Sequence, residues 1–234
     1  MATSELLDTH LEDYFIYFKP KEAVSGDFYW AGELNNGKFA ICCADSTGHG
    51  VPGAIMSILN ISGLEKAIEN GISEASEIFN QTRRTIIERL KKDGSAEGGK
   101  DGMDATLLIL NQKKTKLEYV AANNPIWVIR DNELIILKTE KMPVGKHDKD
   151  FVAFEGGEFS LQKRDLLYTM TDGFQDQLGG EKGKKYKVKP MKQMLLEITQ
   201  LTMPEQYKKI AETFIQWRGN LDQVDDVCIV GIKI

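Results

Sequence analysis

Carboxylates stand at the ends of apolar runs in this sequence, where buried chain meets the surface. The run from Phe39 to Ala44 ends on Asp45, and a Ser-Thr-Gly-His-Gly turn then leads through Val51 and Pro52 into a helical pattern. Such a run predicts a buried strand with a carboxylate at its tip. Because a buried ionised carboxylate must be paired, hydrogen-bonded or bound to metal, Asp45 is a candidate metal ligand. An aspartate that only caps the helix or bonds local amides is the alternative at this position.

The same arrangement recurs at other strand ends. These positions are Asp27, Asp104, Asp172 and the adjacent Asp225 and Asp226. A single aspartate of this kind is often only a turn residue. Several clustered carboxylates, however, cannot all ionise near one another without cations. The set therefore predicts hard divalent ions with oxygen ligands, Mg2+ or Mn2+ in preference to Zn2+, and a pair of such ions suits phosphoester hydrolysis.

A hairpin signal indicates how two of these carboxylates could meet. Asn35-Asn36-Gly37 separates the run that begins at Asp27 from the run Lys38 to Asp45. Asn-Gly between apolar runs is typical of a tight β-hairpin. We therefore expect the two runs to pair antiparallel and to bring Asp27 and Asp45 to the same end of one sheet.

Helical periodicity predicts two pairs of helices. Their ranges are about Val51–Asn70, Glu74–Lys92 with Ser73 as its cap, Pro190–Thr199 and Pro204–Arg218. In the first helix, one buried face is expected to carry Ile55, Ile58, Leu59, Ile61, Leu64 and Ile68.

Apolar and β-branched runs predict the strands. We expect Tyr14–Lys19, a meander of Leu117–Ala122, Ile126–Arg130 and Leu134–Leu137, short strands at Phe151–Phe154 and Glu158–Leu161, and longer ones at Leu166–Thr171 and Val227–Ile234. Residues 91–102 and 179–189 are expected to be surface loops. Strands separated by two helix pairs predict two antiparallel sheets packed face to face, with the helices outside.

Length and charge limit the class of protein. The 234 residues and the formal net charge of −5 fit one domain and argue against nucleic acid as the main partner. We expect residues 14–234 to form that domain and residues 1–13 to be an N-terminal linker or helix tail. No apolar run approaches the roughly 20 residues that cross a bilayer. Cys42, Cys43 and Cys228 lie in apolar runs without zinc-site spacing, which favours reduced core cysteines in a cytoplasmic protein.

Five motifs in a fixed order resemble a known family. SGDFYW, ADSTGHG, MDATLL, TDGF and QVDDVCIVGI follow one another along the chain. In order and spacing they resemble the metal-dependent serine/threonine phosphatases of type 2C, in particular the bacterial SpoIIE and RsbU type that controls sigma-factor partner switching. The resemblance runs from about Phe15 to Ile234. It implies the α+β class and a four-layer αββα sandwich, two antiparallel sheets flanked by antiparallel helix pairs.

The resemblance also implies an activity, cofactors and partners. The activity would be hydrolysis of phosphoserine and phosphothreonine in proteins by a water activated at two divalent cations, Mn2+ or Mg2+. The substrate would be a phosphorylated anti-sigma-factor antagonist or a similar signalling phosphoprotein. An upstream sensor domain and a homodimer are further possible partners. Two other functions also stay open, an inactive phosphatase-like binding module and a hydrolase of small phosphoesters.

Ligand roles follow from the resemblance residue by residue. Asp27 would bind one ion partly through water, and Asp45 would bridge both ions with the Ser46 carbonyl as a further ligand. Asp172 and Asp225 would complete the coordination of the other ion. Asp226 would lie behind the ligands, and Asp104 matches a position linked to a weaker third ion.

His49 and several lysines have two interpretations each. His49 could protonate the leaving seryl oxygen, or its hydrogen bond could fix the glycine turn. Eukaryotic relatives hold the substrate phosphate with an arginine near the first strand, but the first arginine here is Arg83. Lys19 or Lys21 could replace it, or both could be solvated strand-end lysines. The lysines between Lys182 and Lys189 either form a solvated loop or steer an acidic phosphoprotein toward the site.

Overall fold

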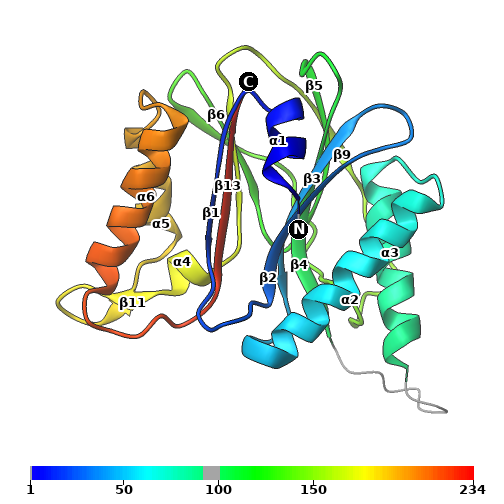
Figure 1. Cartoon of the computed structure of the whole chain (residues 1–234), viewed down its shortest axis with the longest axis horizontal. Helices are drawn as coiled ribbons and strands as arrows, with labels where there is room; N and C mark the ends of the chain where they lie inside the picture. Colours follow the sequence, from blue (N-terminus) through cyan, green and yellow to red (C-terminus); the bar gives the residue numbers. More distant parts are fainter. Residues whose placement is uncertain (1, 92–100) are drawn as a thin grey trace.

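The computed structural model describes residues 2–91 and 101–234. Most of the predicted surface loop 91–102 lies outside these described residues. The remaining chain forms an αββα sandwich, in which two antiparallel sheets face each other and helices cover both outer faces (Figure 1). The predicted fold class is therefore confirmed.

One sheet carries the hairpin expected from the sequence. Its strands are β2 (Asp27–Glu33), β3 (Phe39–Ser46), β4 (Gly102–Leu110), β5 (Lys116–Ala122) and β9 (Gly157–Ser160), with the short β8 (Val144–Gly145) beside β4. The register places Asp27 opposite Asp45 and Asp45 opposite Asp104. Three carboxylates thus lie in one row across neighbouring strands.

The second sheet shows that the predicted meander is wrong. It consists of β1 (Asp13–Lys19), β13 (Val227–Lys233), β10 (Leu166–Met170), β6 (Ile126–Arg130) and β7 (Glu133–Ile136). Only β6 and β7 of the expected meander pair here, because β5 belongs to the first sheet. The chain crosses between sheets at Asn123, whose φ of 58° breaks the extended run, and Pro125 cannot donate to a sheet.

The helices flank the sheets as expected, with small changes at their ends. Helices α2 (Gly50–Glu69) and α3 (Ala75–Leu90) cover the first sheet, and α5 (Val188–Glu197) and α6 (Met203–Arg218) cover the second (Figure 1). The N-cap of α3 is Glu74, whose side chain makes no capping bond to a described residue, so the prediction of Ser73 was wrong. Thr202 and Glu205 form a capping box that starts α6.

The buried face of α2 differs from the predicted stripe. Ile55 and Ile58 are 60% and 68% exposed. Leu64 and Ile68 are buried as predicted. The rest of the buried face carries mostly small or polar residues that were not predicted: Gly50, Gly53, Met56, Ser57, Asn60, Gly63 and Ala67. Since no charged residue occurs between Gly50 and Leu64, apolar periodicity could not distinguish one face of this segment from the other. The small side chains let the helix backbone approach the sheet closely.

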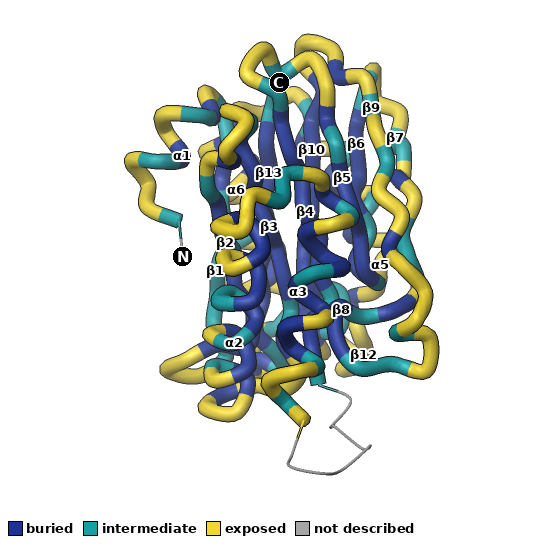
Figure 2. The backbone as a smooth tube through the Cα atoms, turned by 90° about the vertical axis from the view of Figure 1, so that its right-hand side faces the viewer, coloured by how far each residue is buried: buried dark blue, intermediate teal, exposed yellow. Residues whose placement is uncertain are grey.

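The inward faces of both sheets form the central core. Figure 2 shows the central strands β3, β4, β10 and β13 as almost continuously buried segments, whereas the edge strands β7 and β9 are partly exposed. Apolar side chains from both sheets meet there, including Ile41, Leu108, Val128, Leu167 and Val230. Leu7 and Leu11, from α1 (Ser4–His10) and the residue after it, pack on the same cluster. The buried hydroxyls of Thr106 and Thr169 hydrogen-bond each other across the two sheets.

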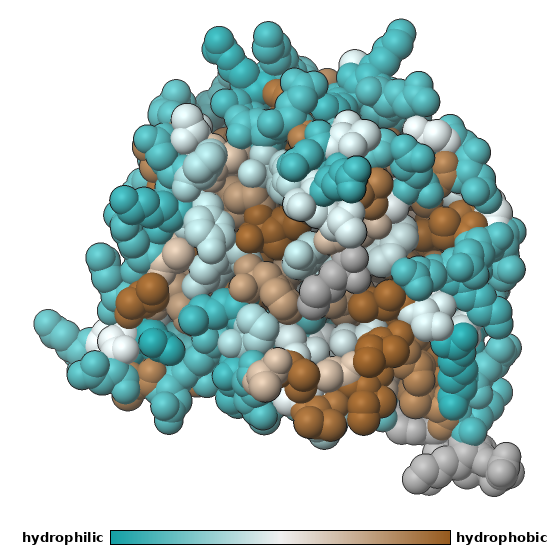
Figure 3. All heavy atoms as spheres, in the orientation of Figure 1, coloured by the Kyte–Doolittle hydropathy of each residue, from teal (hydrophilic) through white to brown (hydrophobic). Residues whose placement is uncertain are grey.

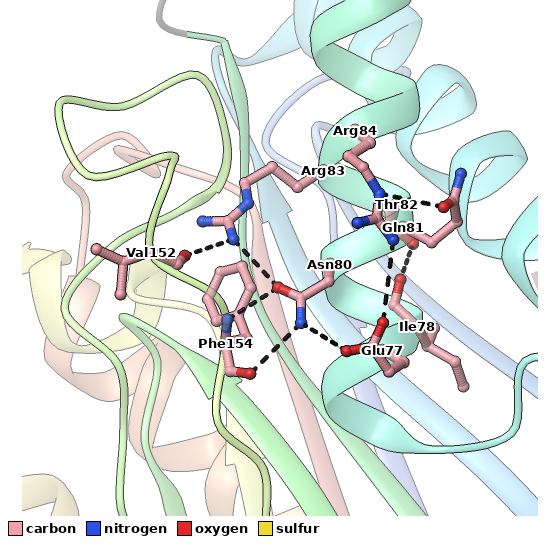
Figure 4. A network of polar contacts seen from close by, with 9 residues as sticks. All are labelled: Glu77, Ile78, Asn80, Gln81, Thr82, Arg83, Arg84, Val152 and Phe154. Carbon is pink, nitrogen blue, oxygen red and sulfur yellow. Dashed lines mark hydrogen bonds and ion pairs between the residues drawn. The ribbon is translucent and has the colours of Figure 1, made fainter.

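A polar network on α3 replaces the short strand predicted at Phe151–Phe154 (Figure 4). The side-chain oxygen of Asn80 accepts a bond from the Phe154 amide at 2.8 Å. Arg83 donates to the Val152 carbonyl at 2.6 Å, and its guanidinium lies 4.5 Å from the centre of the Phe154 ring. The segment forms no strand because helix side chains satisfy its backbone groups. Arg83 is held in this network.

None of the helices formed by the described residues is long and apolar enough to span a bilayer.

An ion pair between Arg130 and the buried Asp165 lies within the second sheet, and Arg130 also bonds to the first sheet. Arg130 Nε and Nη2 donate to the two Asp165 oxygens at 2.8 and 2.6 Å. The same Nη2 reaches the Ser160 carbonyl of β9 at 2.8 Å. The Asp165 side chain is 1% exposed and also accepts the Gln162 amide.

We predict that Asp165→Ala destabilises the fold by about 1–3 kcal/mol, because Arg130 and the Gln162 amide lose the buried carboxylate to which both donate. Urea denaturation followed by circular dichroism would measure this loss. Glu155→Ala is the matched control, since it removes an exposed ion pair with Lys138, and it should change the midpoint little. Equal midpoints for both variants would contradict the role given to Asp165.

Candidate metal centre

Strand ends from both sheets bring carboxylates to one end of the sandwich. Asp27, Asp45 and Asp104 come from the first sheet; Asp172 follows β10 and Asp225 precedes β13 in the second. This end is the lower edge of Figure 1. Burial and the nearby charges of these other aspartates, Asp27 foremost, together raise the pKa of Asp45 to about 10. The residues predicted to form one site are therefore neighbours.

Asp27 is the most buried of these ligand candidates. It is 3% exposed, and burial raises its pKa well above the usual range. The Thr171 hydroxyl donates to its Oδ2 at 2.6 Å, and the same hydroxyl accepts the Cys228 amide at 2.9 Å. Thr171 thus joins the two sheets at the site. Sequence reasoning missed this residue, although it directly precedes Asp172.

Asp45 and Asp172 lie close enough for their carboxyl groups to hydrogen-bond each other. Burial, followed by the charge of Asp176, raises the pKa of Asp172. Two carboxyl groups can share such a bond only if one is protonated. A divalent cation would supply the same compensating positive charge.

The donor set fits a hard divalent ion that keeps part of its water shell. Among residues 2–91 and 101–234, no three His, Cys, Asp or Glu side chains converge on a single ion position. Mg2+ does not require such a cluster, because it commonly binds one or two carboxylates and keeps several waters. The oxygens available are carboxylates and the Ser46 carbonyl, which lies beside Gly26. The residues therefore fit Mg2+ or Mn2+ better than Zn2+.

Asp226 and Asp104 are both engaged with neighbouring protein groups. Asp226 is 2% exposed, and its oxygens accept the Lys21 and Gly26 amides at 2.7 and 2.8 Å. It therefore holds the loop that leads into Asp27. Asp104 accepts a bond from the Asn123 side chain at 2.8 Å. The sequence did not indicate this contact between Asn123 and Asp104.

Three glycines bring α2 against the loop that follows Asp45. A Cβ atom on Gly53 would lie 2.1 Å from the Gly48 carbonyl oxygen, and one on Gly26 would lie 2.3 Å from the same atom. Only hydrogen fits at these positions. From the same helix, the fully buried Asn60 donates to the Ser46 hydroxyl at 2.9 Å and to the Gly102 carbonyl at 3.2 Å. A polar residue on a buried helix face was the signal that could have revealed Asn60.

The cationic candidates lie at the same end of the molecule. His49 is the N-cap of α2, is about half exposed, and its Nδ1 lies 3.0 Å from Glu22 Oε1. The sequence did not indicate Glu22. Lys19 ends β1, and the Lys21 amide binds Asp226. The ammonium groups of both lysines make no ion pair within the described chain.

Comparison with known proteins agrees with this geometry. The family model described as Stage II sporulation protein E (SpoIIE) matches residues 35–234. The chain therefore belongs to the SpoIIE family, whose members include phosphatase domains of the PP2C type. Phosphoserine phosphatase RsbP of Bacillus subtilis (strain 168) is 21% identical over 162 residues, which cover 68% of this chain and 39% of RsbP. The chain thus spans well under half the length of that curated relative.

Solved structures share the whole fold. The SiaA-PP2C domain of Pseudomonas aeruginosa is 29% identical with a TM-score of 0.87, over 98% of this chain and 89% of that one. The catalytic domain of the serine threonine protein phosphatase PstP, solved with two manganese ions, is 17% identical with a TM-score of 0.65, over 94% and 96% of the two chains. These likenesses establish the PP2C fold.

We predict that Gly53→Ala destabilises the protein by about 1–3 kcal/mol, because the new methyl group would collide with backbone atoms that cannot rotate away. It should also weaken Mn2+ binding, since it pushes α2 away from the loop after Asp45. Thermal unfolding and titration calorimetry would measure the two effects.

Gly63→Ala is the matched control on the same helix. Its Cβ would come no closer than 3.4 Å to any neighbouring atom, the Thr82 methyl group being the nearest, so the gain in helix propensity of about 0.5–1 kcal/mol should dominate. If the two variants lost the same stability, the close glycine contact would not be the constraint.

Proposed function

We propose that this chain is a metal-dependent protein phosphatase that hydrolyses phosphoserine and phosphothreonine. The observation that carries the proposal is the row Asp27, Asp45 and Asp104 on one sheet, facing Asp172 and Asp225 from the other. Like charges packed this closely raise one another's pKa, and divalent cations relieve that repulsion. Membership of the SpoIIE family supports the same reaction.

The proposed ligands divide between the two sheets. Asp27 and Asp45, with the Ser46 carbonyl, would hold ions from the first sheet, and Asp172 and Asp225 would hold them from the second. When bound, two Mn2+ or Mg2+ ions would lower the pKa of a water and offset charge on the phosphoryl oxygens. Asp226 would position the loop before Asp27. Asp104 would support a weaker third ion or orient its neighbours.

The remaining polar residues would act on the substrate. Glu22 would orient the imidazole of His49 through their 3.0 Å contact, so that the ring can give a proton to the leaving seryl oxygen. Lys19 and Lys21 would attract the substrate phosphate, in place of the arginine that eukaryotic relatives use. Both lysines lie at or just after the end of β1, and neither ammonium group forms an ion pair with a described residue, which supports this role.

The proposal also extends to the identity of the substrate and of the partners. We propose a phosphorylated anti-sigma-factor antagonist, or a similar signalling phosphoprotein, as the substrate. The family resemblance and the name of RsbP, a phosphoserine phosphatase, support this choice. An upstream sensor domain and a homodimer belong to the same proposal.

Metal removal is the direct test. Phosphate release from a phosphoserine peptide should require Mn2+ or Mg2+ and stop in EDTA. Asp45→Asn should lose at least about 10²-fold in kcat/KM, because it removes a charge from the centre of the site. The control Asp222→Asn changes an exposed aspartate and should retain full activity. Full turnover in EDTA, or by Asp45→Asn, would contradict the proposal.

Leaving-group dependence tests His49. His49→Gln should slow hydrolysis of a phosphoserine peptide by about 10²-fold, because the poor seryl leaving group needs a proton. It should leave p-nitrophenyl phosphate almost unaffected, since p-nitrophenolate leaves without one. His10→Gln, at the opposite end of the sandwich, should change neither rate. Equal slowing of both substrates by His49→Gln would show a structural role instead.

A further inference from the structure

A hairpin rich in lysine extends directly from the candidate metal centre. After Asp172 the chain forms the short α4 (Gly173–Asp176) and then pairs β11 (Leu178–Gly179) with β12 (Lys184–Lys185). We call residues 178–189 the lysine hairpin. Its exposed lysines are Lys182, Lys184, Lys185, Lys187 and Lys189. From the sequence we expected a loop here, either simply solvated or steering an acidic phosphoprotein toward the site, and not a hairpin.

The lysine hairpin is anchored firmly to α6. Trp217 Nε1 donates to the Gln177 carbonyl at 2.9 Å, and the Gly180 amide donates to the Trp217 carbonyl at 2.8 Å. The Tyr186 ring packs edge-on against Phe174 and Trp217, with centroids 5.1 and 5.2 Å away. The positive charges are therefore presented at a defined place relative to Asp172.

Most of these charges are available to a partner. Lys185 donates to Asp176 at 2.6 Å and also experiences the charge of Asp172. The ammonium groups of Lys182, Lys184, Lys187 and Lys189 make no ion pair with any described residue. Figure 3 shows hydrophilic side chains projecting at its lower left, where the hairpin lies in Figure 1.

The charge distribution of the chain shows why positive side chains near the centre would matter for an acidic substrate. The chain carries a formal net charge of −5, and aspartates crowd the candidate centre. An acidic phosphoprotein would be repelled by much of this surface. Fixed positive charges beside the centre would raise the rate at which an acidic substrate encounters the protein, and would favour one orientation of that substrate.

We propose that the lysine hairpin binds acidic side chains that flank the phosphorylated residue of a protein substrate. This rests on the proposed phosphatase function and names the substrate class, a phosphoserine within an acidic segment. The hairpin lysines contact flanking carboxylates, while the phosphate itself lies at the aspartates. Substrate preference is therefore set by charge near the phosphorylated residue.

Two phosphoserine peptides of equal length test the proposal, one with glutamates around the phosphoserine and one with glutamines. Lys182→Glu/Lys184→Glu should lower kcat/KM for the acidic peptide about tenfold at low ionic strength, mainly through KM. The loss should shrink at high salt. Turnover of the neutral peptide and of p-nitrophenyl phosphate should stay unchanged.

Lys113→Glu/Lys163→Glu is the matched control. It makes the same change in net charge at two exposed lysines that line a hollow at the opposite end of the sandwich. An equal loss in this control would mean that only overall charge matters, and the proposal would fail. If the hairpin variant also lost activity on the neutral peptide or on p-nitrophenyl phosphate, the lysines would contact the phosphate group itself. That result would also overturn the proposal.

Binding separates this proposal from the proposed reaction. Fluorescence anisotropy with the unphosphorylated acidic peptide requires no turnover, and weaker binding to the hairpin variant than to the control variant is expected. Wild-type protein that binds this peptide but releases no phosphate from its phosphorylated form would refute the phosphatase function alone. Normal phosphatase activity with equal binding by both variants would refute the hairpin proposal alone.

Discussion

Mutual repulsion among buried carboxylates is the constraint on which the rest of this structure depends. Antiparallel register sets Asp27, Asp45 and Asp104 side by side, and the packing of the second sheet brings Asp172 and Asp225 opposite them. Burial and like-charged neighbours raise the pKa of Asp27, Asp45 and Asp172, so the ionised forms of these three carboxylates are costly. The apolar core between the sheets must hold this arrangement together, and bound cations would relieve it.

Neutral groups around the carboxylates determine their positions without adding charge. Thr171 joins Asp27 to the facing sheet, and Asn60 ties α2 to Ser46 and Gly102. The contact of Gly26, Gly48 and Gly53 leaves no space between α2 and the loop after Asp45. A displacement of α2 would therefore be transmitted to the proposed ligands, since rigid backbone lies between them.

The two ends of the sandwich carry different groups of residues. At the end with the aspartates, the lysine hairpin lies on one side, and the first turns of α2 expose Val51, Ile55 and Ile58 on the other. A protein-sized substrate that reaches the aspartates would meet both. At the opposite end, Arg130 pairs with the buried Asp165 and donates to the Ser160 carbonyl of the other sheet, so these contacts support the fold.

Local sequence determined much of this protein. Asn36-Gly37 specified the hairpin that aligns Asp27 with Asp45, strand-end aspartates marked the candidate centre, and the ordered motifs indicated the family and its layers. Tertiary structure alone decided which face of α2 is buried, where the chain changes sheets at Asn123, and why Phe151–Phe154 forms no strand. It also decided that Thr171, Asn60 and Glu22 adjoin the centre. The physical reason is that periodicity and turn chemistry act between near neighbours, whereas these contacts join segments far apart in sequence and depend on shapes that only the packed layers create.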